Sequence, residues 1–353
     1  MSEISTKIAQ LRTLMIQEGL VALRFKGVDW FAWATGGGSN VVLQTAETGV
    51  AEILLTEKNA FVLHNRIEEP RLREEEVPAE FEILVFPWQQ NLESEILSFL
   101  PKGKVASDLP KPGEVALPAS VLRAKLVLSE VEILRYRKIA SLSATAMQAA
   151  LARATPETTE LQLASFGAQE LISRGIDAAL VLAGGEWRVK KHRHPIPKNV
   201  PIGKSAMLVF CARGMGLFSN LTRFVYFRDL TSQEKDGWSK LNSIESAAFA
   251  ATKSGHSLQQ VYAAMQEQYA KLGCAEEIDR HHQGGPTGYL SREEIAGPFA
   301  AQKMLNIEAN TAFAWNPSLP GQKIEDTILL GATGIEVLTS LKPGMRDNAW
   351  TQR

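Results

Sequence analysis

Cysteine, long apolar runs and net charge are all scarce in this chain of 353 residues. The two cysteines, Cys211 and Cys274, are too few for a disulfide framework and lack the spacing of a zinc finger. No apolar run reaches the ~20 residues of a membrane-spanning helix, and the N-terminal MSEISTKIAQ is too polar for a signal peptide. A net charge of −1 gives no global attraction to nucleic acid or to an acidic membrane. We therefore expect a cytoplasmic protein that binds neither nucleic acid nor membrane.

Acidic residues are absent from one long internal segment. Between Glu186 and Asp229 the chain runs for 42 residues without an aspartate or glutamate, while it carries nine lysines or arginines. His192 and His194 lie in the same segment. Hard divalent cations need several oxygen ligands in a protein site. This segment contains no carboxylate side chain that could bind them. Its positive charge instead favours negatively charged groups at short range.

The first third of the chain predicts a small α/β domain. Apolar residues recur at helical spacing before Gly19, a residue typical of helix C-termini, and alternate with polar residues further on. The expected elements are a helix at 4–19, strands at 51–56 and 60–63, an acidic helix at 67–76 and a strand at 82–86. The segment 109–118 contains proline and glycine and has the composition of a linker. We therefore assign residues 1–127 to one domain and 128–353 to a second.

The second domain shows two successive units of a helix pair and strands. Ser129 precedes a run of apolar residues three and four apart, and Glu132 completes a capping-box pattern at the start of a long helix. A second helix is expected to start in TPETTE at 155–160, with Pro156 at its entry. Strands are expected at 180–183, 207–211 and 224–227, and further helices at 232–254 and 257–272. The fold class is therefore α+β.

Four motifs, in this order and spacing, carry a resemblance to a known family. They are HRHPIPKNVPIGKSAMLVFCARGMGLFSNLTRFVYF, HHQGGPTGYLSRE, AFAWNPSLPGQKIEDTILL and TGIEVLTSL. Together they resemble the pita-bread hydrolases: prolidase, aminopeptidase P, methionine aminopeptidase and the metal-free member creatinase. The resemblance covers nearly the whole chain. It implies a pita-bread catalytic-type domain after a creatinase-like domain, a homodimer, and a small-molecule or peptide substrate.

The resemblance also implies that most metal ligands of that family are missing. It places the five ligand positions at Val209, Asn220, Gly285, Asn316 and Glu325, and a catalytic histidine of the family at Arg292. Only Glu325 keeps a carboxylate at its position. A dinuclear site needs bridging carboxylates to offset the charge of two cations. We therefore expect no metal and no other cofactor.

Three residues are the catalytic candidates. His194 corresponds, by the resemblance, to a histidine that transfers protons in creatinase-like members, and an imidazole can do so near neutral pH. His281 and His282 would point to opposite faces of a strand, so we select His282 for the pocket. A surface histidine at 194 and a structural one at 282 are the alternatives. Glu325 lies in an apolar strand and is a general base, a binder of a substrate cation, or half of an ion pair with an arginine of the cationic segment.

A second set of residues is assigned to substrate binding. These candidates are Arg292, Arg213, Asn220, Asn316 and Trp315. Arg292 stays charged, so it cannot transfer protons, but its guanidinium can clamp a carboxylate in bidentate fashion. Arg213 is a second candidate clamp, and a surface pair with Glu293 is the alternative for Arg292. We therefore expect an anionic or zwitterionic ligand.

Cys211 has two open roles. It ends the strand predicted at 207–211, close to the lost ligand position. A thiolate nucleophile with His194 as its base is one role, and a small buried hydrophobic residue is the other.

Three functions fit these residues. The first is a metal-independent hydrolase of a C–N bond in a small amino-acid-like, peptide or guanidino substrate, with His194 as the proton carrier. The second is a catalytically inactive pita-bread protein that binds a peptide or a partner protein. The third is a conventional Xaa-Pro peptidase whose metal is held by other residues, for which His282, Glu293 and Glu325 are the candidates. We place the metal-independent hydrolase first.

Overall fold

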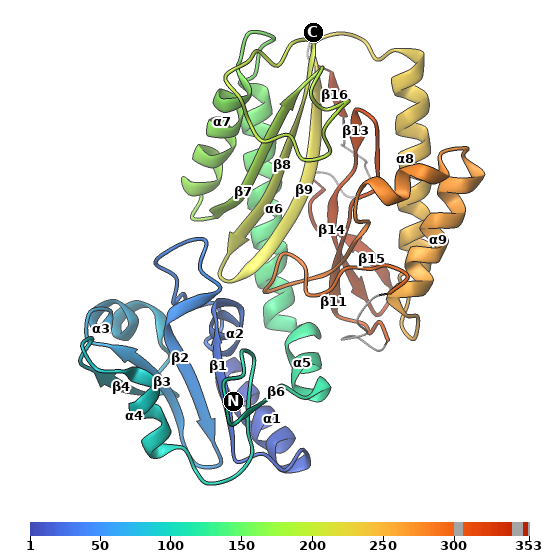
Figure 1. Ribbon diagram of the computed structural model, residues 1–353. Helices are drawn as coiled ribbons and strands as arrows, with labels where there is room; N and C mark the ends of the chain where they lie inside the picture. Colours follow the sequence, from blue (N-terminus) through green and yellow to red (C-terminus); the bar gives the residue numbers. More distant parts are fainter. Residues whose placement is uncertain (300–305, 341–348, 352–353) are drawn as a thin grey trace. The chain divides into compact units, whose positions relative to one another are not determined.

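The computed structural model describes residues 1–299, 306–340 and 349–351, and the chain divides into two compact units (Figure 1). These units are Met1–Lys125 and Leu126–Arg353. The first unit contains a single sheet and the second contains several, and each unit has its own apolar core. Within the described part of the chain, no helix is both long enough and apolar enough to cross a membrane.

The first unit is built on a six-stranded mixed sheet in the order β4-β3-β2-β1-β5-β6. Its elements are α1 (Glu3–Gln17), β1 (Ala22–Gly27), α2 (Val28–Ala34), β2 (Thr48–Thr56), β3 (Ala60–Asn65), α3 (Glu69–Arg71), a π-helix (Leu72–Glu76), β4 (Glu82–Phe86), α4 (Leu92–Phe99), β5 (Val105–Ser107), β6 (Glu114–Ala116) and α5 (Ala119–Leu126). Strands β1, β2 and β3 pair antiparallel, whereas β4, β5 and β6 join in parallel. Residues of β1, β2, β3, α4 and β5 share one core.

Most predicted elements of this unit are confirmed, but the prediction that residues 109–118 form a linker is wrong. The strands at 51–56, 60–63 and 82–86 lie in β2, β3 and β4, and the helix at 4–19 is α1. The segment 109–118 contains β6, which pairs with β5 at the edge of the sheet. The carboxylate of Glu114 accepts hydrogen bonds from Arg24 at 2.9 Å and from Lys26 at 2.6 Å. These ion pairs join residues distant in sequence, so composition gave no sign of them.

The acidic helix also differs from expectation. The predicted helix at 67–76 is a short α-helix, α3, followed by a single π-helical turn. The residues Trp30 and Trp33, for which no element was predicted, lie in the seven-residue helix α2, and both are buried.

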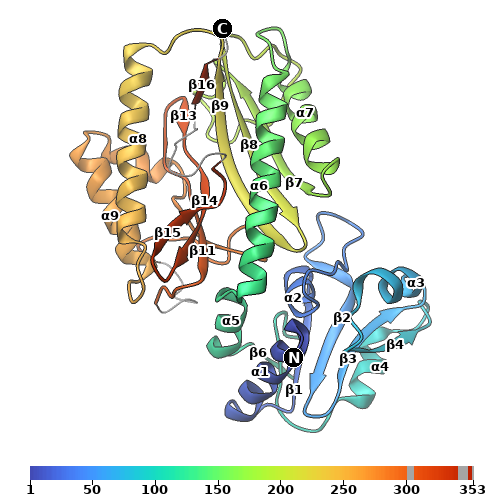
Figure 2. The ribbon, with the colours of Figure 1, turned by 180° about the vertical axis from the view of Figure 1, so that it is seen from behind.

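The second unit consists of two four-stranded sheets, a short ribbon and flanking helices. Its elements are α6 (Glu130–Ala152), α7 (Glu160–Ile172), β7 (Asp177–Gly185), β8 (Ser205–Gly214), β9 (Leu217–Tyr226), α8 (Ser232–Ala251), α9 (Leu258–Lys271), a 3₁₀-helix (Ala275–Arg280), β10 (Gly284–Thr287), β11 (Thr311–Trp315), β12 (Ser318–Leu319), β13 (Gln322–Lys323), β14 (Asp326–Gly331), β15 (Gly334–Val337) and β16 (Ala349–Thr351). The sheets are ordered β16-β9-β8-β7 and β10-β11-β14-β15. Helices α6 and α7 pack on the first sheet, and α8 and α9 flank the second (Figure 2).

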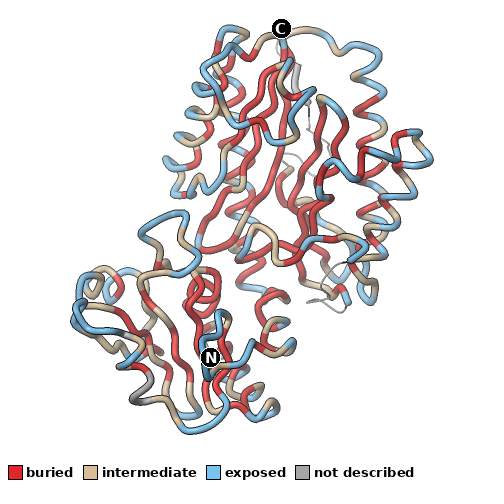
Figure 3. Tube along the Cα trace, in the orientation of Figure 1, coloured by how far each residue is buried: buried red, intermediate tan, exposed pale blue. Residues whose placement is uncertain are grey.

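One apolar core joins the two sheets of this unit. Val209 and Phe224 of the first sheet, Phe313 and Ile328 of the second, and Trp238 of α8 belong to the same buried cluster. Buried residues follow the strands, and exposed residues follow the outer faces of the helices (Figure 3). The site described below lies on these buried strands.

The capping box at Ser129 is confirmed, whereas the start of the next helix was misplaced. The Ser129 N–H donates to the Glu132 carboxylate at 2.9 Å, and the Ser129 hydroxyl accepts from the Glu132 N–H. Helix α7 begins only at Glu160, because Thr159 is its N-cap, so Pro156 lies in the preceding turn. The predicted strand at 224–227 is the end of β9, which begins already at Leu217.

Candidate functional site

The two sheets of the second unit are joined at Glu325. Thr222 of β9 forms an isolated antiparallel bridge with Glu325, and its N–H donates to the Glu325 carbonyl at 3.0 Å. Next to this bridge, the Asn220 N–H donates to the Thr327 hydroxyl at 2.8 Å. The Glu325 side chain is therefore held beside strand β9.

Glu325 lies at the centre of a buried ion cluster formed with Arg292 and Lys323. Its Oε1 accepts a hydrogen bond from Arg292 Nη2 at 2.7 Å, and its Oε2 lies 3.1 Å from Lys323 Nζ. The Thr222 hydroxyl donates to Oε2 at 2.8 Å. The side chains of Arg292, Lys323 and Glu325 are only 12%, 4% and 3% exposed. We call these three residues the Arg–Glu–Lys cluster.

The Arg–Glu–Lys cluster carries more positive than negative charge. Burial alone would raise the pKa of Glu325, but the Lys323 and Arg292 cations and the Thr222 hydroxyl hold that pKa far below its usual range. Glu325 is therefore ionised at neutral pH and faces two cations. One positive charge remains uncompensated within the three-residue cluster.

These contacts favour one of the roles that were open for Glu325 and one of those for Arg292. Glu325 is half of an ion pair, but its partners come from the segment after β10 and from β13, and not from the cationic segment between Glu186 and Asp229. Arg292 pairs with Glu325 rather than with Glu293, whose carboxylate accepts from the Leu290 N–H at 3.2 Å. A carboxylate held by two cations is a weak base, so the role of general base loses support.

Three histidines meet near this cluster. The Nε2 atoms of His194 and His281 are 2.9 Å apart, and the rings of His281 and His282 stack with centroids 4.6 Å apart. The prediction that His281 and His282 point to opposite faces is wrong, because both precede β10, which begins at Gly284. Sequence reasoning selected His194 and His282 but left out His281, the buried member of the group.

The hydrogen bonds of His281 fix its tautomer. Its Nδ1 lies 2.6 Å from the carbonyl oxygen of His282. A carbonyl only accepts, so Nδ1 carries the proton and Nε2 of a neutral His281 accepts from His194 Nε2–H. Desolvation, followed by the positive charge of Lys323, lowers the pKa of His194 and of His281, and desolvation with the Arg292 cation lowers that of His282 to about 4. All three imidazoles are therefore neutral at pH 7.

The two asparagine candidates are tied to the protein by different bonds. Asn220 Nδ2 donates to the Thr287 hydroxyl at 3.1 Å and to the Ser291 carbonyl at 3.3 Å. The backbone N–H of Asn316 donates to the Gln283 carbonyl at 3.1 Å. Both Oδ1 atoms are buried and accept no hydrogen bond from the described residues. The two amides therefore offer oxygen atoms, but no charge, to a ligand.

Trp315 and Arg213, two of the predicted substrate-binding residues, do not join the cluster. Trp315 is 0% exposed and stacks on Phe313 in the core, with ring centroids 5.7 Å apart. Arg213 lies over the Phe218 ring at 5.6 Å, near the β8–β9 hairpin. Four residues of strand, on the order of 13 Å, separate it from Val209, which pairs with Thr222 beside the cluster.

The surroundings of Cys211 disfavour a thiolate. Burial and the nearby negative charge of Glu325 raise the pKa of its thiol to about 11. The thiol therefore stays protonated at neutral pH, whereas a nucleophile must be a thiolate. This favours the role of a small apolar residue.

Lys323 and Thr222 are the site residues that sequence reasoning missed. Lys323 stands two residues before Glu325, so in an extended chain both side chains point to the same face. That spacing was a usable signal. For Thr222 the sequence gave no such signal, because its contact with Glu325 joins residues 103 positions apart.

The residues at the five expected ligand positions do not fit a pair of divalent cations. Val209 is buried in the apolar core, and the Glu325 carboxylate is already bound by two cations. At Gly285, even a Cβ atom would come within 2.2 Å of the Glu294 carbonyl oxygen. The segment that follows β10 is held there by a hydrogen bond of 2.8 Å from the Ala296 N–H to the Gly284 carbonyl. A histidine at position 285 would therefore require the backbone to move.

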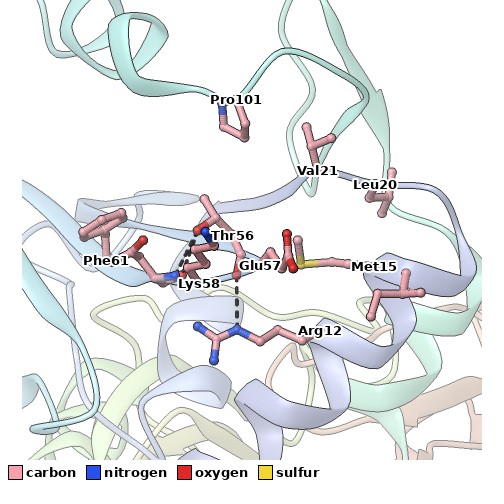
Figure 4. Close-up of a pocket in the computed structure, with 11 residues that line it drawn as sticks. Arg12, Met15, Leu20, Val21, Thr56, Glu57, Lys58, Phe61 and Pro101 are labelled. Atoms are coloured by element: carbon pink, nitrogen blue, oxygen red, sulfur yellow. Dashed lines mark hydrogen bonds between the residues drawn. The ribbon is translucent and has the colours of Figure 1, made fainter.

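The first unit contains a separate cavity of about 560 Å³ (Figure 4). Apolar side chains of α1 and of the chain after it line it together with the β2–β3 turn and Pro101. Arg12 closes one side, where its Nε donates to the Thr56 carbonyl at 3.2 Å. None of the predicted site residues lines this cavity. The residues that line it belong to none of the four motifs.

The chain is similar to several solved structures, although no curated protein sequence matches it. The prolidase from Pyrococcus horikoshii OT3 matches with a TM-score of 0.80 and 17% identity, over 97% of this chain and 100% of that chain. The Xaa-Pro dipeptidase from Bacillus anthracis matches with a TM-score of 0.77 and 15% identity, over 99% and 100%. The N-terminal domain of the FACT complex subunit SPT16 from Cicer arietinum (chickpea) matches with a TM-score of 0.71 and 13% identity, over 98% and 99%.

At these identities the structural likeness shows the fold alone, which is the mixed α/β pita-bread fold that the motifs predicted. Residues 135–332, more than half of the chain, match the family model of metallopeptidase family M24. The chain therefore belongs to metallopeptidase family M24.

Proposed function

We propose that this M24 protein works without a dinuclear metal centre and binds a small anionic or zwitterionic ligand, an amino-acid-like compound or a short peptide, at the Arg–Glu–Lys cluster. The observation that carries this proposal is the pairing of Glu325 with Arg292 and Lys323. Two protein cations stand beside the remaining carboxylate, so the positive charge that attracts an anionic group is built into the chain.

Burial strengthens the attraction of the cluster for a carboxylate. Arg292 is the more exposed of the two cations; its Nη2 donates to Glu325 at 2.7 Å and its Nη1 donates to the Ser291 carbonyl at 2.6 Å. A guanidinium offers five N–H donors in a planar fork, which suits a carboxylate better than an ammonium does. Arg292 is therefore the residue of the cluster that we assign to ligand binding.

Hydrolysis of a C–N bond in this ligand is the second candidate function, and His194 is the observation that favours it. His194 is exposed and neutral, and its Nε2–H is directed to His281. Its Nδ1 is thereby left with a lone pair that can accept a proton. If the protein binds the ligand but does not turn it over, the inactive peptide-binding function takes its place.

The ligand is best sought by thermal stabilisation. A panel of amino acids, dipeptides, Xaa-Pro peptides and guanidino acids is added to the full-length protein, because a ligand of the native state raises the Tm. Arg292→Met is expected to weaken the best anionic ligand by roughly 2 to 5 kcal/mol, the range for a desolvated charge pair. Arg213→Met is the matched control, since it removes the same charge outside the cluster.

Two results would overturn the proposal. One is stabilisation by neutral or cationic compounds alone. The other is an equal loss of affinity in Arg213→Met and Arg292→Met. Because Arg292 also binds the buried Glu325, the Tm of each variant is first measured without ligand, so that lost stability is not counted as lost binding.

A further inference from the structure

His194, His281 and His282 form a cluster that the proposed function does not use as a unit. His194 comes from the segment between β7 and β8, and the other two from the segment between the 3₁₀-helix and β10. One ring nitrogen of each residue lies within 4.8 Å of the others. The segments are 87 residues apart in sequence, so the fold alone brings these rings together.

We propose that these three histidines bind a single transition-metal ion, for which Zn²⁺ is the probe, at a place separate from the five expected ligand positions of the family. Three histidine nitrogens with one open position are a known arrangement for zinc, with Zn–N bonds of about 2.0–2.1 Å. Tetrahedral geometry at that bond length puts the nitrogens about 3.3 Å apart. The 2.9 Å pair must therefore open slightly and the third nitrogen must approach, which are changes that side-chain rotation can supply.

The hydrogen bond of His281 orients it for this role. A metal-binding histidine usually donates its other ring N–H to a carbonyl or carboxylate, which aims the free nitrogen at the ion. His281 donates Nδ1–H to the carbonyl of His282 and directs Nε2 into the cluster. In the hydrogen bond to His281, Nε2 of His194 carries the proton, so this proton moves to Nδ1 of the same ring when Nε2 binds the ion.

The surroundings select the kind of ion. Lys323 and Arg292 repel a cation, and Glu325 offsets only one of these two positive charges. An ion that is bound only by electrostatic attraction is therefore not expected to bind here. Imidazole nitrogen suits zinc, copper, nickel and cobalt, whereas magnesium, calcium and manganese prefer oxygen. We expect the fourth position to hold an anion, because the same positive charges then stabilise it.

The test is a calorimetric titration of full-length, chelator-stripped protein with Zn²⁺, followed by the visible spectrum of the Co²⁺ form. We expect one ion per chain and the absorption of tetrahedral cobalt. His281→Ala is expected to weaken Zn²⁺ binding more than tenfold, and His194→Ala is the second variant if the buried His281 is needed for folding. His192→Ala is the matched control, because this exposed histidine stands two residues from His194 and outside the cluster.

Each outcome decides the inference. Saturable binding of one Zn²⁺ that His192→Ala keeps and His281→Ala or His194→Ala loses supports it. No saturable binding, two ions per chain, or an equal loss in His192→Ala overturns it. Arg292→Met separates this inference from the proposed function, since it removes the carboxylate clamp and keeps all three histidines.

Discussion

Glu325 is a buried carboxylate whose charge and hydrogen-bonding capacity are met by neighbouring side chains. In this chain its oxygens bind Arg292, Lys323 and Thr222, and the side chain is almost fully buried. Buried ions are tolerated when they are paired and hydrogen-bonded. The cluster therefore has a structural role whether or not a ligand binds to it.

Removal of Lys323 tests this structural role. Lys323→Met leaves Glu325 with Arg292 and Thr222 only, and we expect a loss of roughly 3 kcal/mol, the low end for a broken buried pair. Urea unfolding measures it. In the double variant Lys323→Met, Glu325→Gln the loss is expected to be smaller than the sum of the two single losses. Additive losses would show that the two side chains do not interact.

Restoring one carboxylate should not restore a metal centre. In Asn220→Asp the new acid lies in a site whose other acid is already bound by two cations, and a manganese ion needs several oxygen ligands. We expect titration calorimetry with Mn²⁺ to give no tight binding, in the variant as in the wild type. Tight binding by this single variant would mean that the remaining ligands are already in place.

At the scale of elements, caps and ion pairs stabilise helices of this protein. The capping box of α6 is one case, since Ser129 and Glu132 satisfy each other's backbone N–H groups. Ser129→Ala is expected to lower the free energy of unfolding by about 1 kcal/mol. Ser141→Ala, an exposed position on the same helix, is the control and should not destabilise the protein. Chemical denaturation measures the free energy of unfolding of both variants. Equal losses in the two variants would contradict the role of Ser129 as a cap.

Helix α4 is tied to the sheet of the first unit by Glu93. This residue binds Arg24 of β1 at 2.6 and 2.8 Å, and also Lys111. The hydrogen bond from Arg24 is the main cause that lowers the pKa of Glu93 to about 2, from 4.5. Because the folded-state pKa is the lower one, this stabilisation is complete above pH 4.5 and is lost as pH falls towards 2.

The free energy of unfolding, measured at acid pH, reports the contribution of the Glu93–Arg24 ion pair. Glu93→Gln is expected to reduce stability at pH 7 and to flatten the decline between pH 4.5 and about 2. Glu74→Gln changes an exposed glutamate of the same unit and serves as the control. A curve for Glu93→Gln parallel to that of the wild type across this window would contradict the assignment.

At the scale of the whole molecule, the fold is that of metallopeptidase family M24. Prolidases and the N-terminal domain of SPT16 share this fold, so the fold does not decide between catalysis and binding. The resemblance also implies a homodimer, which stays a prediction. With a chain mass of 38.8 kDa, we expect sedimentation equilibrium to give twice that value. A mass of one chain at micromolar concentration would contradict it.

The sequence by itself determined the elements and the fold. Helical and alternating periodicities located α1, β2, β3, β4, α8 and α9, because those patterns depend on residues close together in the chain. The motif order identified the pita-bread fold, and through the resemblance Val209, Asn220, Gly285 and Asn316 led to the prediction that metal ligands are missing. The same local reasoning failed at 109–118, where a composition typical of linkers hides the edge strand β6.

Only the tertiary structure decided which candidates meet. It joined Arg292 and Lys323 to Glu325, separated Arg213 from them, and placed Trp315 in the core. It also brought His281 to His194 at 2.9 Å. These outcomes depend on distances between segments that are far apart in sequence, and such distances follow from how the sheets pack and not from the period or composition of any one segment.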